Sequence, residues 1–231
     1  MESEYIEAIL HCAKKCTKMA RQKRDPFHKA TDKFFEIFSS ALEENLHERS
    51  HGNRHIMSKP FERAIISSFK EIDGVIVGGS PRLEGTGDDF PKKYLDILVT
   101  GSRLPSANRS IVIEIKGTGF DPIAAALMSF AVASRKGENF SCSVDGERIV
   151  RKIQPMNTRF LIVNNAAFRH EKQHFDMCMN VVGDIIKNVG HHAFFPWGKI
   201  TENMHEDIYL GVRAFFKEQV EFLTSTRPSK A

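Results

Sequence analysis

Two carboxylates and one lysine stand out because each lies in a run of otherwise apolar, strand-forming residues. Asp96 lies within residues 93–99, and Glu114 and Lys116 lie within residues 110–116. An ionised carboxylate is costly to bury unless a cation or hydrogen-bond donors compensate its charge. Residues two apart on a strand share a face, so Glu114 and Lys116 face the same side. If the two strands pair, two carboxylates and an ammonium meet at one edge of the sheet.

Such a cluster suits metal-assisted hydrolysis of a phosphodiester bond. Asp96, Glu114 and the carbonyl oxygen of Ile115 offer oxygen ligands to Mg²⁺, and Mn²⁺ is expected to substitute for it. A bound metal lowers the pKa of its water and neutralises charge in the transition state. Lys116 would hold the attacking water and contact the phosphate. The alternative is that Asp96 and Glu114 face solvent on an antiparallel sheet, with Lys116 as a cross-strand partner.

The elements that must position these residues are indicated by hydrophobic spacing and by glycine and proline. Two helices are predicted within the first 47 residues, and Pro60 opens a third over about 60–72. Further helices are predicted over 122–135, 169–189 and 203–224. Strands are predicted over 74–78, 93–99, 110–116, 160–163 and 191–195, with a hairpin formed by 140–144 and 147–153. The central order of helix, three strands, helix and strand predicts an α/β layer arrangement.

The spacing of the polar residues within these elements resembles that of a known family. Asp96, followed eighteen positions later by Glu114-Ile115-Lys116, resembles the PD-(D/E)xK nuclease superfamily, which includes type II restriction endonucleases. Leu95 stands where the motif has proline. The resemblance implies a restriction-endonuclease-like αβββαβ core with a mixed central β-sheet flanked by helices. It also implies that Asp96 and Glu114 bind the metal, that Lys116 is catalytic, and that Glu62 contributes from the first core helix. The alternative for Glu62 is an ordinary exposed helix residue.

The length and composition suit one nuclease domain over residues 1–231. The 26.2 kDa chain is 41% apolar, enough to bury a core and to exclude wholesale disorder. We expect an N-terminal helical region at 1–55, the catalytic core at 59–164, and C-terminal helices with a strand at 165–231. No apolar run approaches the roughly 20 residues that span a bilayer, so no membrane partner is expected. A cytoplasmic location is expected, with four free cysteines.

The charge balance permits binding to nucleic acid without requiring it. Lysine and arginine number 33 against 29 aspartate and glutamate residues, which gives a net charge of +4. Basic side chains in the loops that enter the catalytic strands, and around the hairpin, are the expected contacts to double-stranded DNA. They are Arg82, Lys92, Lys93, Arg103, Arg109, Arg135, Lys136, Arg148, Arg151 and Lys152.

Together these features predict a Mg²⁺-dependent endodeoxyribonuclease. A type II site-specific restriction endonuclease is the expected form, and it would act as a homodimer because symmetric sites call for two active sites. A DNA repair or phage-type nuclease of the same superfamily is an alternative, as is a non-catalytic DNA-binding domain. No nucleotide triphosphate is expected, because the short segments 85–87 and 117–119 lack the lysine of a phosphate-binding loop.

A second motif points to different chemistry. His170-Glu171-Lys172-Gln173-His174 matches the HExxH pattern of zinc metallopeptidases, in which two histidines four apart on a helix bind zinc and the glutamate activates water. Lys172 breaks the usual uncharged middle of that motif. The alternative is a solvated first turn of a helix.

Overall fold

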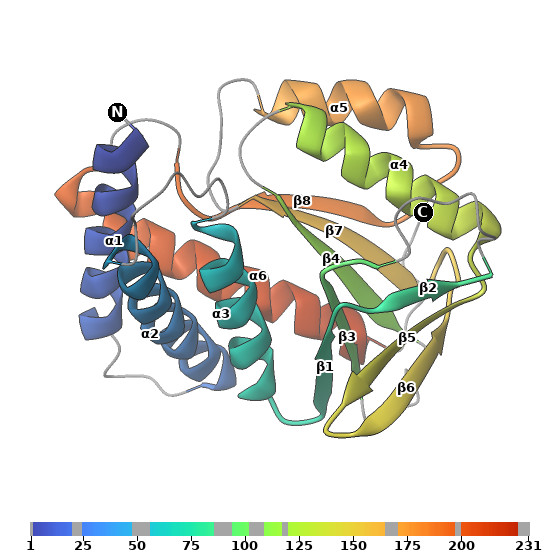
Figure 1. Ribbon diagram of the computed structural model, residues 1–231, viewed down its shortest axis with the longest axis horizontal. Coiled ribbons are helices and arrows are strands. Elements are labelled where there is room, and N and C mark those ends of the chain that lie inside the picture. Colours follow the sequence, from blue (N-terminus) through green and yellow to red (C-terminus); the bar gives the residue numbers. More distant parts are fainter. Residues whose placement is uncertain are drawn as a thin grey trace.

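A five-stranded mixed sheet forms the centre of the molecule (Figure 1). The computed structural model describes residues 2–19, 25–47, 56–85, 94–101, 109–116, 120–164, 171–196 and 200–225. The strand order is β1-β3-β4-β7-β8, in which β1, β3 and β4 are antiparallel neighbours and β4, β7 and β8 are parallel neighbours. These strands span Val75–Gly79, Ile97–Gly101, Ser110–Lys116, Thr158–Asn164 and Val189–Ala193.

Helices cover both faces of this sheet (Figure 1). On one face α3 and α6 pack against the strands, and α2 and α1 lie behind them in the same apolar core; the other face packs against α4 and α5. The helices span Glu2–Met19 (α1), Pro26–His47 (α2), Ser58–Lys70 (α3), Phe120–Lys136 (α4), Glu171–Val182 (α5) and His205–Thr224 (α6), and a short 3₁₀ helix, Glu202–Met204, precedes α6. The α/β arrangement, with its mixed central sheet and αβββαβ core, is therefore confirmed.

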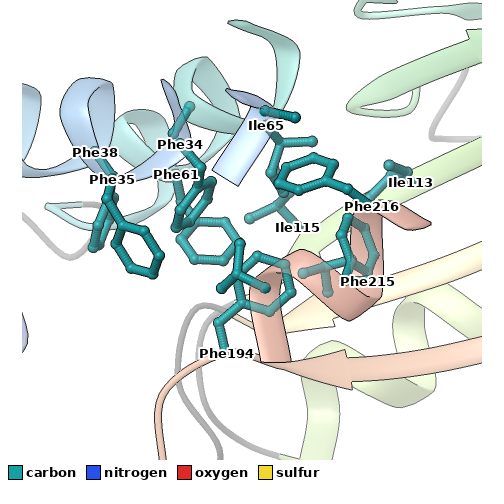
Figure 2. Close-up of a cluster of buried hydrophobic side chains, with 14 of the residues drawn as sticks. Phe34, Phe35, Phe38, Phe61, Ile65, Ile113, Ile115, Phe194, Phe215 and Phe216 are labelled. Atoms are coloured by element: carbon teal, nitrogen blue, oxygen red, sulfur yellow. The ribbon is translucent and has the colours of Figure 1, made fainter. Parts of the chain in front are cut away.

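The face toward α2, α3 and α6 is built largely from phenylalanine. Figure 2 shows side chains from these helices and from β4 meeting in one cluster. Phe34 of α2 lies at its centre, fully buried and in edge contact with Phe61 of α3 at 5.3 Å between ring centroids. Ile113 and Ile115 of β4 complete this cluster from the sheet side. Alternate residues of β4 therefore point into an apolar core.

A second sheet, of order β2-β5-β6, packs beside the first. Its strands span Arg82–Glu84, Asn139–Val144 and Glu147–Lys152. The predicted hairpin is confirmed, and its turn residues Asp145 and Gly146 have φ values of 51° and 85°. Positive φ at both positions matches the twist of the flanking strands. Gly78 of β1 lets the sheets approach closely, because a Cβ there would lie 2.6 Å from the sulfur of Cys142.

The structure corrects several predicted boundaries. The strand expected over 93–99 begins at Ile97, and the helix expected over 169–189 ends at Val182. There the chain turns through Gly183, whose N–H donates to the carbonyl of Met179, before entering β8. Strand β2 was not predicted, because three residues within a Gly- and Pro-rich segment carry too little alternation to indicate a strand.

Candidate active site

The register of the central sheet brings the two predicted carboxylates to one edge. Ile97 of β3 pairs with Ile113 of β4, so the chain just before β3 reaches the end of β4. There the N–H of Ile115 donates to Oδ2 of Asp96 at 2.7 Å. The predicted juxtaposition of Asp96 with Glu114-Ile115-Lys116 is thus present, although Asp96 lies ahead of the strand rather than inside it.

The main chain on both sides of Asp96 is held by the segment that leaves β1. The N–H of Ser80 donates to the carbonyl of Asp96 at 2.8 Å, and the N–H of Leu95 donates to the carbonyl of Pro81 at 3.0 Å. Ser80 has a φ of 48°, in the left-handed region that few residues other than glycine adopt. The bend at Ser80 carries the chain out of the central sheet into β2 and leaves Asp96 fixed beside β4.

Glu114 and Lys116 form an ion pair at the end of β4. The Glu114 side chain is fully buried, and that of Lys116 is 18% exposed. The Lys116 ammonium donates to Oε2 of Glu114. Burial of the carboxylate excludes the alternative in which Glu114 faces solvent. An ionised carboxylate at such depth needs a cation, which Lys116 supplies.

Glu62 approaches this edge from the first turns of α3. Its carboxylate lies over Gly79, where a Cβ would be 4.0 Å from Oε1 of Glu62. Burial raises the pKa of Glu62 above its ordinary value, and the charges of Asp96 and Glu114 raise it further. The positive charge of Lys59 lowers the pKa in part. Glu62 is therefore close enough to sense both carboxylates, and it is not the ordinary exposed residue of the alternative interpretation.

The donor set of this edge fits a divalent cation that prefers oxygen. A strand residue directs both of its main-chain polar groups toward the same neighbouring strand. Because the N–H of Ile115 faces Asp96, the carbonyl oxygen of Ile115 lies on that side too. Carboxylates of Asp96 and Glu114 with this carbonyl are hard ligands of the kind that Mg²⁺ and Mn²⁺ accept. Among the described residues, no group of three or more His, Cys, Asp and Glu side chains lies close enough to hold a metal.

One predicted DNA contact lies directly beside this edge. Arg82 is exposed and forms an isolated antiparallel bridge with Tyr94, two residues before Asp96. Tyr94 is 54% exposed, so much of its surface faces solvent. Arg82 and Tyr94 therefore provide an exposed cation and an exposed ring on the two segments that pair just before Asp96. Sequence reasoning did not single out Tyr94, because a lone tyrosine in a strand-like run indicates packing as readily as binding.

The other predicted DNA contacts are spread over the molecule. Arg135, Lys136, Arg148 and Lys152 are exposed, and Arg148 pairs with Glu84. Arg151 donates to the hydroxyl of Thr100, at the far end of β3 and about 13 Å along the strand from Asp96. Lys92, Lys93 and Arg103 lie outside the described residues.

Arg109 is the predicted contact that the structure places in the interior. It is only 6% exposed, donates to the carbonyl of Phe222, and lies over the Phe222 ring at 5.1 Å. These contacts join β4 to the end of α6. We therefore leave Arg109 out of the proposed DNA-binding surface.

The zinc motif falls at the start of α5. His170 lies outside the described residues, α5 begins at Glu171, and His174 is half-buried in the first turn. Within the part of the chain that the structure describes, no cluster of His, Cys, Asp and Glu forms around His174 that would hold a metal.

None of the described helices has both the length and the apolar character that crossing a membrane requires.

Comparison with known proteins gives matches among solved structures alone. No protein-family model and no curated protein matches the chain. NucC from P. aeruginosa ATCC27853 in its cAAA-bound form is 11% identical, with a TM-score of 0.45 over 73% of this chain and 76% of that chain. NucC from E. coli MS115-1 in its cAAA-bound form is 12% identical, with a TM-score of 0.46 over 74% and 76%. The apo form of the E. coli protein is 15% identical, with a TM-score of 0.38 over 67% and 73%.

Proposed function

We propose that this chain is a Mg²⁺-dependent endodeoxyribonuclease of the PD-(D/E)xK type. The observation that carries the proposal is the meeting of Asp96, Glu114 and Lys116 at one edge of the central sheet. A buried carboxylate paired with a lysine occurs in structural ion pairs as well. A second carboxylate beside the same pair, with Glu62 sensing both, adds repulsion that a purely structural pair would avoid.

Each residue has a distinct task in this proposal. Asp96, Glu114 and the carbonyl of Ile115 would hold the metal, which would lower the pKa of a bound water and neutralise phosphate charge. Lys116 would exchange its pairing with Glu114 for contacts to water and phosphate. Its ammonium then orients the attacking water and contacts the scissile phosphate. Arg82 and Tyr94 contact the DNA beside the site, by a phosphate contact and by the aromatic ring.

The proposal extends to the type of cleavage. We infer a site-specific restriction endonuclease that acts as a homodimer on duplex DNA, because one chain offers a single such edge among its described residues and double-strand cleavage needs two. A nuclease that nicks or degrades DNA without fixed sites is the alternative within the same chemistry. The products separate them: discrete plasmid fragments indicate site-specific cleavage, and a smear or accumulated nicks indicate repair or degradation.

A plasmid-cleavage assay tests the proposal directly. Wild-type protein should cleave with Mg²⁺ or Mn²⁺ and be inactive in EDTA. Asp96→Asn should be inactive under all conditions, because it keeps an acceptor for the N–H of Ile115 but loses the charge that binds the metal. Asp184→Asn, an exposed residue beyond α5, is the matched control and should cleave normally. Equal cleavage in EDTA and Mg²⁺, or full activity of Asp96→Asn, would contradict the proposal.

A further inference from the structure

One polar side chain at this edge of the sheet has no part in the proposal so far. Asn164 is the last residue of β7 and is fully buried. The rest of the strand is apolar from Phe160 to Val163, as suits a buried parallel strand. Asparagine is disfavoured in strands, and a buried amide is costly unless it is hydrogen-bonded. Its place at the end of β7 therefore calls for a reason.

The register gives Asn164 a particular neighbour. In the parallel pairing of β4 with β7, Asn164 is the direct partner of Lys116, just as Ile162 is the partner of Glu114. Adjacent strands lie about 4.8 Å apart, so side chains of paired residues are in contact range. On the other side, Asn164 is paired with Ala193 of β8.

Asn164 and Lys116 also point to the same face of the sheet. Val112 of β4 and Ile162 of β7 belong to the core beneath α4 and α5, and alternate residues of a strand share a face. Lys116 and Asn164 follow Val112 and Ile162 at even spacing, so both point toward that side. The intervening Ile115 and Val163 point into the phenylalanine core instead.

We propose that Asn164 is a positioning residue for Lys116 in the phosphodiester hydrolysis inferred above, on which this inference rests. The Lys116 ammonium donates to Glu114 in the structure. With Glu114 engaged as a metal ligand, the nearby positive charge would weaken its hold on Lys116, and the ammonium would need another acceptor. The Oδ1 atom of Asn164 supplies it from the adjacent strand. The ammonium would then be held toward the phosphate, with its other N–H groups directed to water and substrate.

A matched pair of substitutions tests this role in the full-length protein. Threonine and valine have nearly the same shape and both suit strands, but only threonine keeps an acceptor. Asn164→Val should lower the single-turnover cleavage rate at saturating DNA and Mg²⁺ by about 10–100-fold, as loss of a supporting partner does at metal sites. Asn164→Thr should recover at least part of that loss. Affinity for DNA in Ca²⁺ should stay within twofold of wild type in both, because a buried amide does not touch DNA.

The double variant distinguishes positioning from a structural role. In a Lys116→Ala background, Asn164→Val should cause no further loss of rate, since the group that it positions is gone. Thermal unfolding in EDTA and in Ca²⁺ gives a readout independent of activity, and Ca²⁺ should stabilise Asn164→Val as much as wild type because the metal ligands are intact. If Asn164→Val does not fold, Asn164→Ser and Asn164→Ala form a second pair, in which only serine keeps a hydrogen-bond acceptor.

The outcomes separate this inference from the proposed function. A wild-type protein without metal-dependent cleavage would overturn the proposed function and this inference with it. Wild-type cleavage together with equal rates for the valine and threonine variants would overturn the role of Asn164 alone. A rate loss that adds fully to that of Lys116→Ala, or a loss confined to DNA affinity, would overturn it as well.

Discussion

The two faces of the central sheet differ in composition although the same strands build them. Toward α2, α3 and α6, the strands present Ile113, Ile115, Leu161 and Val163, all within one apolar core. Toward α4 and α5, apolar residues give way at the ends of β4 and β7 to Glu114, Lys116 and Asn164. Neighbouring residues in sequence thus serve different purposes. One face stabilises the strands, and the end of the other face carries the chemistry, so substitutions on the two should affect different measurements.

Among substitutions that leave the proposed metal ligands in place, the largest expected effect on activity comes from Lys116→Met. This change removes the ammonium but keeps most of the side-chain length, and the cleavage rate should fall by about 10²–10⁴-fold, the range for loss of a group that assists proton transfer. Metal-dependent binding of DNA, measured by gel shift in Ca²⁺, should persist because the carboxylates remain. The melting temperature of the variant should also be lower in EDTA than in Ca²⁺. In EDTA the buried Glu114 carboxylate has lost the Lys116 ammonium, and Ca²⁺ would supply a positive charge in its place. Unchanged cleavage would refute the role of Lys116.

Substitutions on the opposite face of the sheet should change the stability of the protein rather than its cleavage activity. Phe34→Ala removes a fully buried ring from the phenylalanine core and should lower the free energy of unfolding by about 3–5 kcal/mol. Phe27→Ala, at the half-buried start of the same helix, is the control and should cost less. Denaturant titration measures both. Cleavage per folded molecule should equal that of wild type for each variant. A lower cleavage rate per folded molecule for Phe34→Ala alone would contradict the proposed division between the two faces.

A smaller effect is expected from the basic residue beside the site. Arg82→Gln should weaken DNA binding several-fold at low salt and lower the slope of log affinity against log salt by about 1, as expected for one lost phosphate contact. Lys70→Gln changes an exposed residue at the distant end of α3 and serves as the control. Fluorescence anisotropy with labelled duplex at several salt concentrations measures the slope. Equal slopes for both variants and wild type would remove Arg82 from the DNA-binding surface.

The smallest effect concerns Glu62 and the pH dependence of stability. Because its pKa is raised in the folded state, the folded protein holds this proton more tightly than the unfolded chain does. Glu62 therefore lowers stability progressively as the pH rises from the ordinary carboxyl range through the raised pKa. Glu62→Gln should melt above wild type at neutral pH and equal it in acid, where Glu62 is protonated. At neutral pH, Mg²⁺ should reduce the difference in melting temperature between the two proteins. A wild-type melting temperature above that of Glu62→Gln at neutral pH would contradict the expected direction of the effect.

Much of the fold was predictable because its elements are strongly periodic. The spacing of Phe61, Ile65 and Phe69 on α3 and the apolar run of β4 both indicate their elements without ambiguity. Boundaries near the site were less predictable. Asp96 lies outside β3 because Ser80 and Pro81 bind the main chain around it, and no local pattern encodes contacts between segments so far apart in sequence.

The candidate site was predictable from spacing as far as Asp96, Glu114 and Lys116. Asn164 was not, because its significance depends on the parallel register of β4 and β7, which single-strand patterns do not determine. Arg109 shows the converse error. Its place in a polar, basic stretch indicates a surface loop, but the cation–π contact with Phe222 of α6, distant in sequence, draws it into the interior.

The central claim is that the carboxylate of Glu114 serves catalysis rather than folding, and Glu114→Gln tests it most directly. Cleavage in Mg²⁺ and thermal unfolding should be measured on the same preparation, with the exposed Glu147→Gln as the matched control. We expect Glu114→Gln to be inactive and to melt at or near the wild-type temperature, because it loses a metal ligand while Lys116, partly exposed, can be solvated. Cleavage at the wild-type rate by folded Glu114→Gln would contradict the account.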